Sequence, residues 1–270
     1  MTGASHQFEL LTELVEEVSS KIILPGRESL DQTRKQDSSP VTQIDNLVQS
    51  RLVDELPKII DVPVMGEEMS SDLQSKLIEL GDFWCVDPID GTTNYINGIP
   101  HFAVSIALLK RGRPVIGLVH APMTQETFCA EAGGGAYANG IRLLGNSRLK
   151  KELSHAVANI DFKRLPKALR RVLVESPPYA SQRNIGSAAL EWCYVAAGLF
   201  DVYLHGRQKL WDYAAGSLVL EEANGKFRTF DRPDFWAELS LSNSVVAALD
   251  ESCFEEWTRW LGETLHKTPS

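Results

Sequence analysis

The sequence predicts a mixed α/β fold. Near its start, apolar residues recur at the spacing of a helix, and they would share one face of that helix: Phe8, Leu11, Val15, Val18 and Ile22. Between residues 102 and 138 the pattern changes to short apolar segments separated by turn residues, which is typical of an antiparallel meander. Beyond residue 143, strand-like and helical segments alternate. With 270 residues and 43% hydrophobic content, the chain can bury a large core.

Two helices are expected before the first strand. The opening helix is expected to stop near Pro25-Gly26, because proline and glycine both disfavour its continuation. The segment from Thr42 to Asp45 matches a helix-start box for a second helix, so Asp45 could simply cap its first turn. Apolar residues then recur at helical spacing: Ile44, Leu47, Val48, Leu52 and Leu56.

The first strands are expected around two acidic positions. Residues 62–65 indicate a short strand that ends in acid, and residues 83–86 indicate a buried strand that ends at Asp87. Pro88 is expected to stop the strand ladder there. The meander is assigned to residues 103–109, 114–120, 127–131 and 136–138. The glycines at 133–135 are interpreted as a turn, since a phosphate loop would also need a lysine and a hydroxyl residue.

The second half of the chain is expected to be more helical. Its strands are assigned to residues 154–160, 201–204 and 245–249. Its helices are assigned to residues 166–175, 187–197, 212–223 and 254–265. We expect an N-terminal α+β part at residues 1–142, with the antiparallel sheet, and a C-terminal α/β part at residues 143–270.

Residues 87–94, with the sequence DPIDGTTN, are the strongest chemical signal in the chain. Two carboxylates stand three residues apart beside a glycine and two hydroxyls. Gly91 permits a tight turn that frees the amides of residues 91–93 to face an anion. Carboxylates alone would repel a phosphate, so they must first hold cations, and such hard oxygen ligands suit Mg²⁺.

Each acidic segment also has a structural interpretation. Asp87 and Asp90 could form an Asx turn and cap a helix. Glu67, in a Gly-Glu-Glu segment, could be a solvated turn residue, and Asp212 is a good N-cap for the helix that it opens. For each segment alone, these structural roles would be preferred.

Together these segments resemble the inositol monophosphatase family, the lithium-sensitive, magnesium-dependent phosphomonoesterases. The resemblance covers nearly the whole chain and is carried, in order, by Lys35, residues 39–45 (SPVTQID), 66–68 (GEE), 84–95 (WCVDPIDGTTNY), 183–189 (RNIGSAA) and 211–212 (WD). It implies a layered α-β-α-β-α sandwich and a homodimer.

The resemblance also implies a set of magnesium ligands. Glu67, Asp87 and the backbone carbonyl of Ile89 would bind one ion, and Asp87, Asp90 and Asp212 a second. A weaker third ion would lie near Glu67. Two like charges about 4 Å apart repel by roughly 4 kcal/mol at an effective dielectric near 20, so such a cluster requires cations or protons.

The remaining roles concern the phosphate and the attacking water. The resemblance implies that Gly91 and Thr92 donate to the phosphate, and that Asp90 also contacts substrate. Thr92, oriented by Asp45, would position and deprotonate a metal-activated water together with Glu67. Lys35 would lie near the metals and phosphate, although a lysine in a polar loop is usually solvated.

The substrate side departs from the family pattern. Inositol-specific members carry an acidic residue seven positions before the last metal-binding aspartate, where this chain has His205, while Ala188 matches the family. With Arg207 and Lys209 nearby, a leaving group with its own negative charge would be favoured. Alternatively, these two residues are surface charges and His205 only fills space. Inositol-1-phosphate is the leading substrate, with fructose-1,6-bisphosphate, histidinol phosphate and 3'-phosphoadenosine 5'-phosphate as alternatives.

Composition limits the other classes of function. The net charge of −9 makes nucleic-acid binding an unfavoured interpretation, and no stretch is apolar enough to span a bilayer. Four scattered cysteines and the lack of a signal pattern at residues 1–7 indicate a cytoplasmic location. A non-enzymatic alternative is a regulatory protein that binds the transcription machinery.

Overall fold

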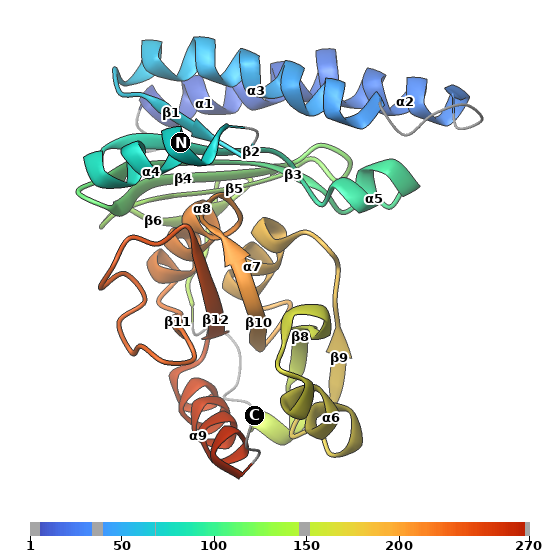
Figure 1. Ribbon diagram of the computed structural model, residues 1–270, viewed down its shortest axis with the longest axis vertical. Coiled ribbons are helices and arrows are strands. Elements are labelled where there is room, and N and C mark those ends of the chain that lie inside the picture. The colour runs from blue at the N-terminus through green and yellow to red at the C-terminus, as the bar shows by residue number, and fades with distance from the viewer. Residues whose placement is uncertain (1–5, 34–39, 68, 146–151, 268–270) are drawn as a thin grey trace.

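The structure is a computed structural model that describes residues 6–33, 40–67, 69–145 and 152–267. Figure 1 shows five layers, in which helices and sheets alternate. The first helical layer contains α1 (His6–Val18), α2 (Leu24–Thr33) and α3 (Pro40–Ile59). The central helical layer contains α7 (Ala188–Ala196) and α8 (Leu210–Glu222), and the last contains α6 (Lys167–Glu175) and α9 (Glu251–Lys267). This is the layered α-β-α-β-α sandwich that the sequence resemblance implied.

The first sheet contains the expected meander. Within the described residues its order follows the chain: β1 (Val64–Gly66), β2 (Phe83–Asp90), β3 (Ala103–Lys110), β4 (Arg113–Ala121), β5 (Glu126–Glu131), β6 (Gly135–Ala138) and β7 (Ile141–Arg142). Strands β1 and β2 pair in parallel, and all later neighbours are antiparallel. Every residue of β2 is buried, because helices cover both faces of the sheet.

The second sheet is mixed. Its described strands are β8 (Val157–Asp161), β9 (Ser181–Arg183), β10 (Val202–Lys209), β11 (Lys226–Arg228) and β12 (Ser242–Ala248), in the order β11-β12-β10-β8-β9. Strand β10 pairs in parallel with β8, and this register places His205 beside Asp161. Two residues 44 positions apart in sequence are thereby brought together at the ends of neighbouring strands.

The described apolar side chains pack in clusters that match the layers. One lies between the first helices and the first sheet, and one lies around α7 and α8 between the sheets. A third packs the second sheet against α6 and α9. Along β10, Tyr203 belongs to the central cluster, whereas Val202 and Leu204 belong to the outer one. This alternation buries both faces of the second sheet.

The opening helix does not stop at Pro25-Gly26. A π-helical turn, Ser19–Ile23, follows α1, and α2 continues directly from Leu24. The Leu24 amide donates to the Ser19 carbonyl, five residues back. Proline normally breaks a helix because its ring clashes with a carbonyl four residues earlier. The wider π turn moves the preceding carbonyls and lets the helix pass through Pro25.

The second helix also differs from its prediction. It begins at Pro40, a favourable first helical residue, so Thr42 is not its N-cap. Ile44, Val48 and Leu52 are buried as expected. Leu47 is 58% exposed, because a stripe with a spacing of four residues leaves it on the outer face.

The third difference lies at Pro88. Strand β2 continues through this residue to Asp90, so the predicted stop at Asp87 is wrong. Asp87 pairs with Ser105 and Asp90 with Ala103, so β2 uses one more residue than β3 between these pairs. Such a bulge leaves a residue outside the ladder and accommodates proline within a strand.

Several shorter elements were not anticipated. They include α4 (Ser71–Leu80) and the strands β7, β9 and β11. A short helix, α5 (Thr92–Asn97), starts directly after Gly91. In the part of the chain that the structure describes, no helix combines the length and apolar character needed to cross a bilayer.

Candidate active site

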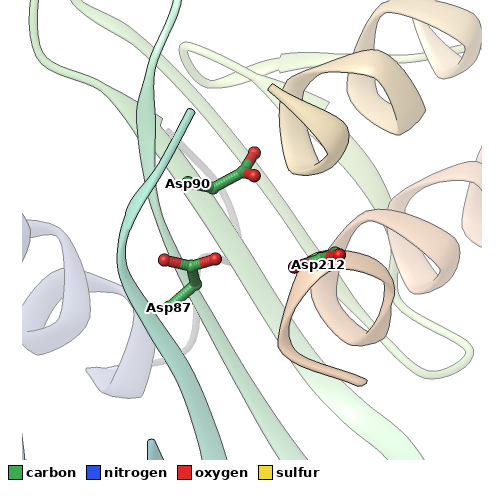
Figure 2. A group of neighbouring side chains, drawn as sticks. All are labelled: Asp87, Asp90 and Asp212. Carbon is green, nitrogen blue, oxygen red and sulfur yellow. The ribbon is translucent and has the colours of Figure 1, made fainter. Parts of the chain in front are cut away.

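Three aspartates from two layers converge at the site. Asp87 and Asp90 come from the end of β2, and Asp212 comes from the first turn of α8 (Figure 2). One carboxylate oxygen from each lies within 4.8 Å of the others. Asp87 and Asp90 are buried, and Asp212 is partly so. The sequence prediction that distant acidic segments meet in one place is confirmed for these residues.

The bulge in β2 explains why Asp87 and Asp90 can share a site. In a regular strand, residues three apart point to opposite faces of the sheet. The additional residue at the bulge reverses this alternation and places both side chains on the face toward α8. Asp87 Oδ1 also accepts a hydrogen bond of 3.1 Å from the Ile89 amide, which holds the turn.

Asp90 joins β2 to the central helical layer. Its Oδ2 accepts hydrogen bonds from Ser187 Oγ at 2.5 Å and from the Ala189 amide at 2.8 Å. Ser187 is the N-cap residue of α7, so Asp90 occupies the end of that helix where free amides are available. Asp90 thus has a defined orientation before any ligand binds.

Asp212 is held by the start of α8. The helix begins at Leu210, with Lys209 as its N-cap, so Asp212 is the third helical residue and not the cap itself. Its Oδ2 accepts a hydrogen bond of 2.8 Å from the Lys209 amide. This capping-box bond orients the carboxylate toward Asp87 and Asp90.

The cluster strongly disfavours its own ionisation. Burial and the neighbouring charges of Asp90 and Glu67 raise the pKa of Asp87 well above its usual value. Burial and the charge of Asp90 raise the pKa of Asp212 to about 8. Such a group must bind protons or cations at neutral pH. Because its donors are carboxylate oxygens, it fits a hard divalent cation such as Mg²⁺.

A cleft of about 380 Å³ contains most of the predicted site residues. They are Glu67, Asp87, Ile89, Asp90, Gly91, Thr92, Ala188, His205 and Asp212. Asp45 does not line this cleft, but it is buried nearby, since its charge contributes to the raised pKa of Asp87. Lys35 lies outside the described residues.

Gly91 lines the cleft beside α5, and Asn94 on that helix holds the neighbouring loop. Gly91 has φ +90°, and a Cβ there would lie 3.0 Å from the His101 carbonyl oxygen, so a side chain is excluded. Asn94 Nδ2 donates to the Ile185 carbonyl at 2.7 Å. The motif that starts at Asp87 therefore also fixes the segment before α7. Thr92 Oγ1 donates to the Ile89 carbonyl at 3.1 Å.

The two basic residues after His205 have different positions. Lys209 lines the cleft, with its Nζ 5.8 Å from the centre of the Trp211 ring. Arg207 is exposed and is absent from the cleft lining, and its Nε donates to Ser242 Oγ at 3.3 Å. The basic neighbourhood predicted from the sequence therefore includes Lys209 but not Arg207.

Sequence reasoning assigned no role to several residues that line the cleft. They are Asp161, Lys163, Arg164, Asn184, Gly186, Glu191 and Trp211. A usable signal existed for Asp161, because it ends a strand and is followed by two basic residues in a short turn. Its meeting with His205 depends on the parallel register of β8 and β10, which no local pattern reveals.

Glu191 is the least predictable of these residues. It lies on α7 and is only 2% exposed. Its Oε2 accepts from the Tyr203 hydroxyl at 2.8 Å, and its Oε1 accepts from the amides of Ile185 and Gly186 at 3.2 and 3.3 Å. Burial raises the pKa of Glu191, although these donors oppose the shift. The residue connects the cleft loop before α7 to β10.

These features define a layered α/β protein with a carboxylate cluster that could hold a metal ion, and comparison with known proteins identifies its family. The sequence profile of the inositol monophosphatase family matches residues 4–267, and the chain belongs to this family. The sequence resemblance is thereby confirmed, and a phosphatase is the coarse function that it supports.

Three comparisons illustrate the relationship. The chain is 38% identical to a fructose-1,6-bisphosphatase/inositol-1-monophosphatase of Thermotoga maritima, over 76% of this chain and 78% of that protein. It is 36% identical to the Nus factor SuhB of Pasteurella multocida, over 74% and 75% of the two chains. The crystal structure of inositol monophosphatase II from Staphylococcus aureus superposes with a TM-score of 0.80 at 26% identity, and the match covers 96% and 97% of the two chains.

Proposed function

We propose that this protein is a magnesium-dependent phosphatase that hydrolyses a small phosphate monoester by direct attack of water. The observation that carries the proposal is the convergence of Asp87, Asp90 and Asp212 within 4.8 Å, in a cleft large enough for a small substrate. Membership of the inositol monophosphatase family supports the same chemistry.

The proposed ligands fall into two sets. Glu67, Asp87 and the carbonyl of Ile89 hold one Mg²⁺, and Asp87, Asp90 and Asp212 hold a second, with a weaker third ion near Glu67. The placement of all five residues around one cleft supports these sets. When bound, the ions supply an acidified water and neutralise charge on the leaving alkoxide.

The protein groups orient the reactants. The amides at Gly91 and Thr92, at the start of α5, face the phosphate, while Thr92 and Glu67 orient the water and accept its proton. Asp45 supports Thr92 from behind the cleft, consistent with its burial close to Asp87. In the structure, Thr92 Oγ1 is anchored on the Ile89 carbonyl, beside the proposed metal ligands. Ala188 contacts the substrate at the start of α7, and we propose that Lys35 approaches the phosphate.

Inositol-1-phosphate is the first substrate to test, with fructose-1,6-bisphosphate, histidinol phosphate and 3'-phosphoadenosine 5'-phosphate as comparisons. The name of the Thermotoga maritima relative joins the first two of these substrates in one protein. We also propose that the protein acts as a homodimer and is inhibited by Li⁺.

The decisive experiment measures phosphate released from this panel with Mg²⁺, with Mg²⁺ plus Li⁺, and with excess chelator. We expect activity in Mg²⁺, its loss in chelator and its recovery when Mg²⁺ is restored. Equal activity in chelator would overturn the proposal. An Asp212→Asn preparation should be inactive throughout, which excludes a contaminating phosphatase.

A second candidate function is regulatory binding to the transcription machinery. It is favoured by relatives that carry the name Nus factor SuhB, including the one from Pasteurella multocida. A pull-down against purified RNA polymerase, using wild type, Asp90→Asn and Asp212→Asn, tests this role. If the protein is regulatory, all three forms should capture the polymerase. If none of the three forms captures it, the regulatory role is rejected.

A further inference from the structure

The wall of the cleft formed by the second sheet is organised around a buried pair of polar residues. His205 and Asp161 are 4% and 8% exposed, and His205 Nε2 lies 2.9 Å from Asp161 Oδ2. His205 Nδ1 accepts a hydrogen bond of 3.1 Å from the Arg207 amide. This bond assigns the ring proton to Nε2, which donates to Asp161. Both ring nitrogens are therefore occupied by protein partners.

Asp161 in turn orders a short turn that carries two cationic residues. It is the N-cap of the short 3₁₀ turn Phe162–Arg164, where its Oδ1 accepts from the Lys163 amide at 2.7 Å. Its Oδ2 also accepts from Arg164 Nη1 at 3.1 Å. Burial would raise the pKa of Asp161, but the hydrogen bond from His205 and the other donors hold it at about 2. The carboxylate is thus ionised and orders the turn that carries Lys163 and Arg164.

The charge balance of the cleft follows from these contacts. The acidic groups of β2 and α8 face the proposed magnesium site, so bound cations offset their charge. Asp161 is already paired with Arg164. Lys163 and Lys209 remain as cations that line the same cleft, and the Arg164 guanidinium still has donors beyond its one contact with Asp161. The part of the cleft lined by the end of β10 and the 3₁₀ turn is therefore rich in cationic donors.

We infer that the alcohol portion of the substrate carries a second anionic group, a phosphate or a carboxylate, and that Lys163 and Arg164 bind it. This inference rests on the proposed phosphatase function and specifies the substrate class of that site. His205 is a positioning residue, because it contacts Asp161 rather than the substrate. A neutral polyol would find few free acceptors on this wall, since three donors already occupy Asp161.

Two substrate pairs test the inference directly. 2-Phosphoglycerol and 2-phosphoglycerate differ only in a hydroxymethyl or carboxylate group, and fructose 1-phosphate and fructose 1,6-bisphosphate differ in a distant phosphate. We expect kcat/KM to favour the more anionic member of at least one pair by roughly tenfold, as charge-assisted hydrogen bonds allow. The preference should shrink as ionic strength rises.

Variants then assign the preference to the wall. Lys163→Ala and Arg164→Ala should each reduce it several-fold through KM, whereas Arg207→Ala should leave it unchanged. Arg207 is the matched control, because it is an exposed arginine beside His205 but outside the cleft. His205→Ala should also reduce the preference, and His205→Gln, which retains an amide donor toward Asp161, should restore part of it.

The outcomes separate this inference from the proposed function. Magnesium-dependent hydrolysis of both members of each pair at rates within about twofold would overturn the inference and leave the phosphatase proposal standing. The inference would also be overturned if Arg207→Ala lowered the preference as much as Arg164→Ala. Absence of magnesium-dependent hydrolysis for every substrate would reject the phosphatase proposal itself.

Discussion

Ser187 Oγ donates to Asp90 Oδ2 at 2.5 Å and thereby joins the end of β2 to the first residue before α7. The Ala189 amide donates to the same oxygen. A carboxylate that we assign to magnesium therefore also anchors the central helical layer. Asp90 has two separable roles, one electrostatic and one as a hydrogen-bond acceptor.

Asp90→Asn should separate these roles. The amide oxygen can still accept from Ser187, while the lost charge weakens the magnesium site and relieves repulsion among the carboxylates. We expect activity at ordinary Mg²⁺ to fall by roughly 100-fold or more, as loss of several kcal/mol of metal stabilisation implies. The melting temperature in chelator should stay the same or rise, and a large drop would show that the charge itself is structural. Asp54→Asn, at an exposed position on α3, is the control and should change neither quantity.

The metal-free protein should lose stability as pH rises. The pKa of Asp212 is about 8 in the folded protein, against about 3.9 for an unfolded aspartate, so the folded state binds more protons between these values. The contribution of Asp212 to the free energy of unfolding is fully present below about pH 4 and is lost as pH rises through about 8. Chemical unfolding across this range, in chelator and in Mg²⁺, measures the effect. We expect a decline in chelator that Mg²⁺ reduces, and a metal-free curve that rose toward pH 8 would contradict the assignment.

Glu191→Leu should destabilise the fold. The substitution leaves the Tyr203 hydroxyl and the amides of Ile185 and Gly186 without their buried acceptor. An unsatisfied buried Tyr203 hydroxyl costs about 1–3 kcal/mol, and the partly exposed amides of Ile185 and Gly186 add less, so we expect a loss of roughly 2–3 kcal/mol in the free energy of unfolding. Glu175→Leu is the matched control on the exposed surface of α6 and should stay within about 0.5 kcal/mol. If Glu191→Leu and Glu175→Leu lowered the free energy of unfolding equally in urea titrations, the hydrogen bonds around Glu191 would contribute little to stability.

Gly206→Ala should disturb the wall that carries Arg164. A Cβ at Gly206 would lie 1.9 Å from the Arg164 carbonyl oxygen, so the backbone of the 3₁₀ turn must move. We expect a loss of about 1–3 kcal/mol in stability and a weaker preference for anionic substrates. Gly262→Ala on α9 meets no atom within 4 Å and should instead stabilise by up to about 1 kcal/mol. If Gly206→Ala left kinetics and stability unchanged, the 3₁₀ turn would be able to move away from the added Cβ without a measurable loss of free energy.

The parts of the site that could be predicted are those encoded locally. Residues 87–94 carry two carboxylates, a turn glycine and two hydroxyls within one segment, so their chemistry can be inferred without the fold. The family resemblance then added Glu67 and Asp212, whose separate segments have ordinary structural interpretations. The metal and substrate roles of these residues remain predictions, as do the homodimer and the two-part division at residue 142.

The parts that could not be predicted depend on strand register and on backbone irregularity. The pairing of Asp161 with His205 follows from the parallel alignment of β8 with β10. The shared orientation of Asp87 and Asp90 follows from the bulge at Pro88, whereas a regular strand would separate them. The passage of the first helix through Pro25 likewise depends on a π turn that helix propensity does not reveal.

Because the site is assembled from several layers, catalytic activity should depend on how closely these layers pack against one another. Strand β2 brings two aspartates, the helix between the sheets brings the third, and the second sheet forms the opposite wall. Slight sliding of one sheet against the other would disperse the carboxylates while leaving each strand and helix intact. Mild denaturant or warming should therefore abolish activity before circular dichroism detects any loss of secondary structure.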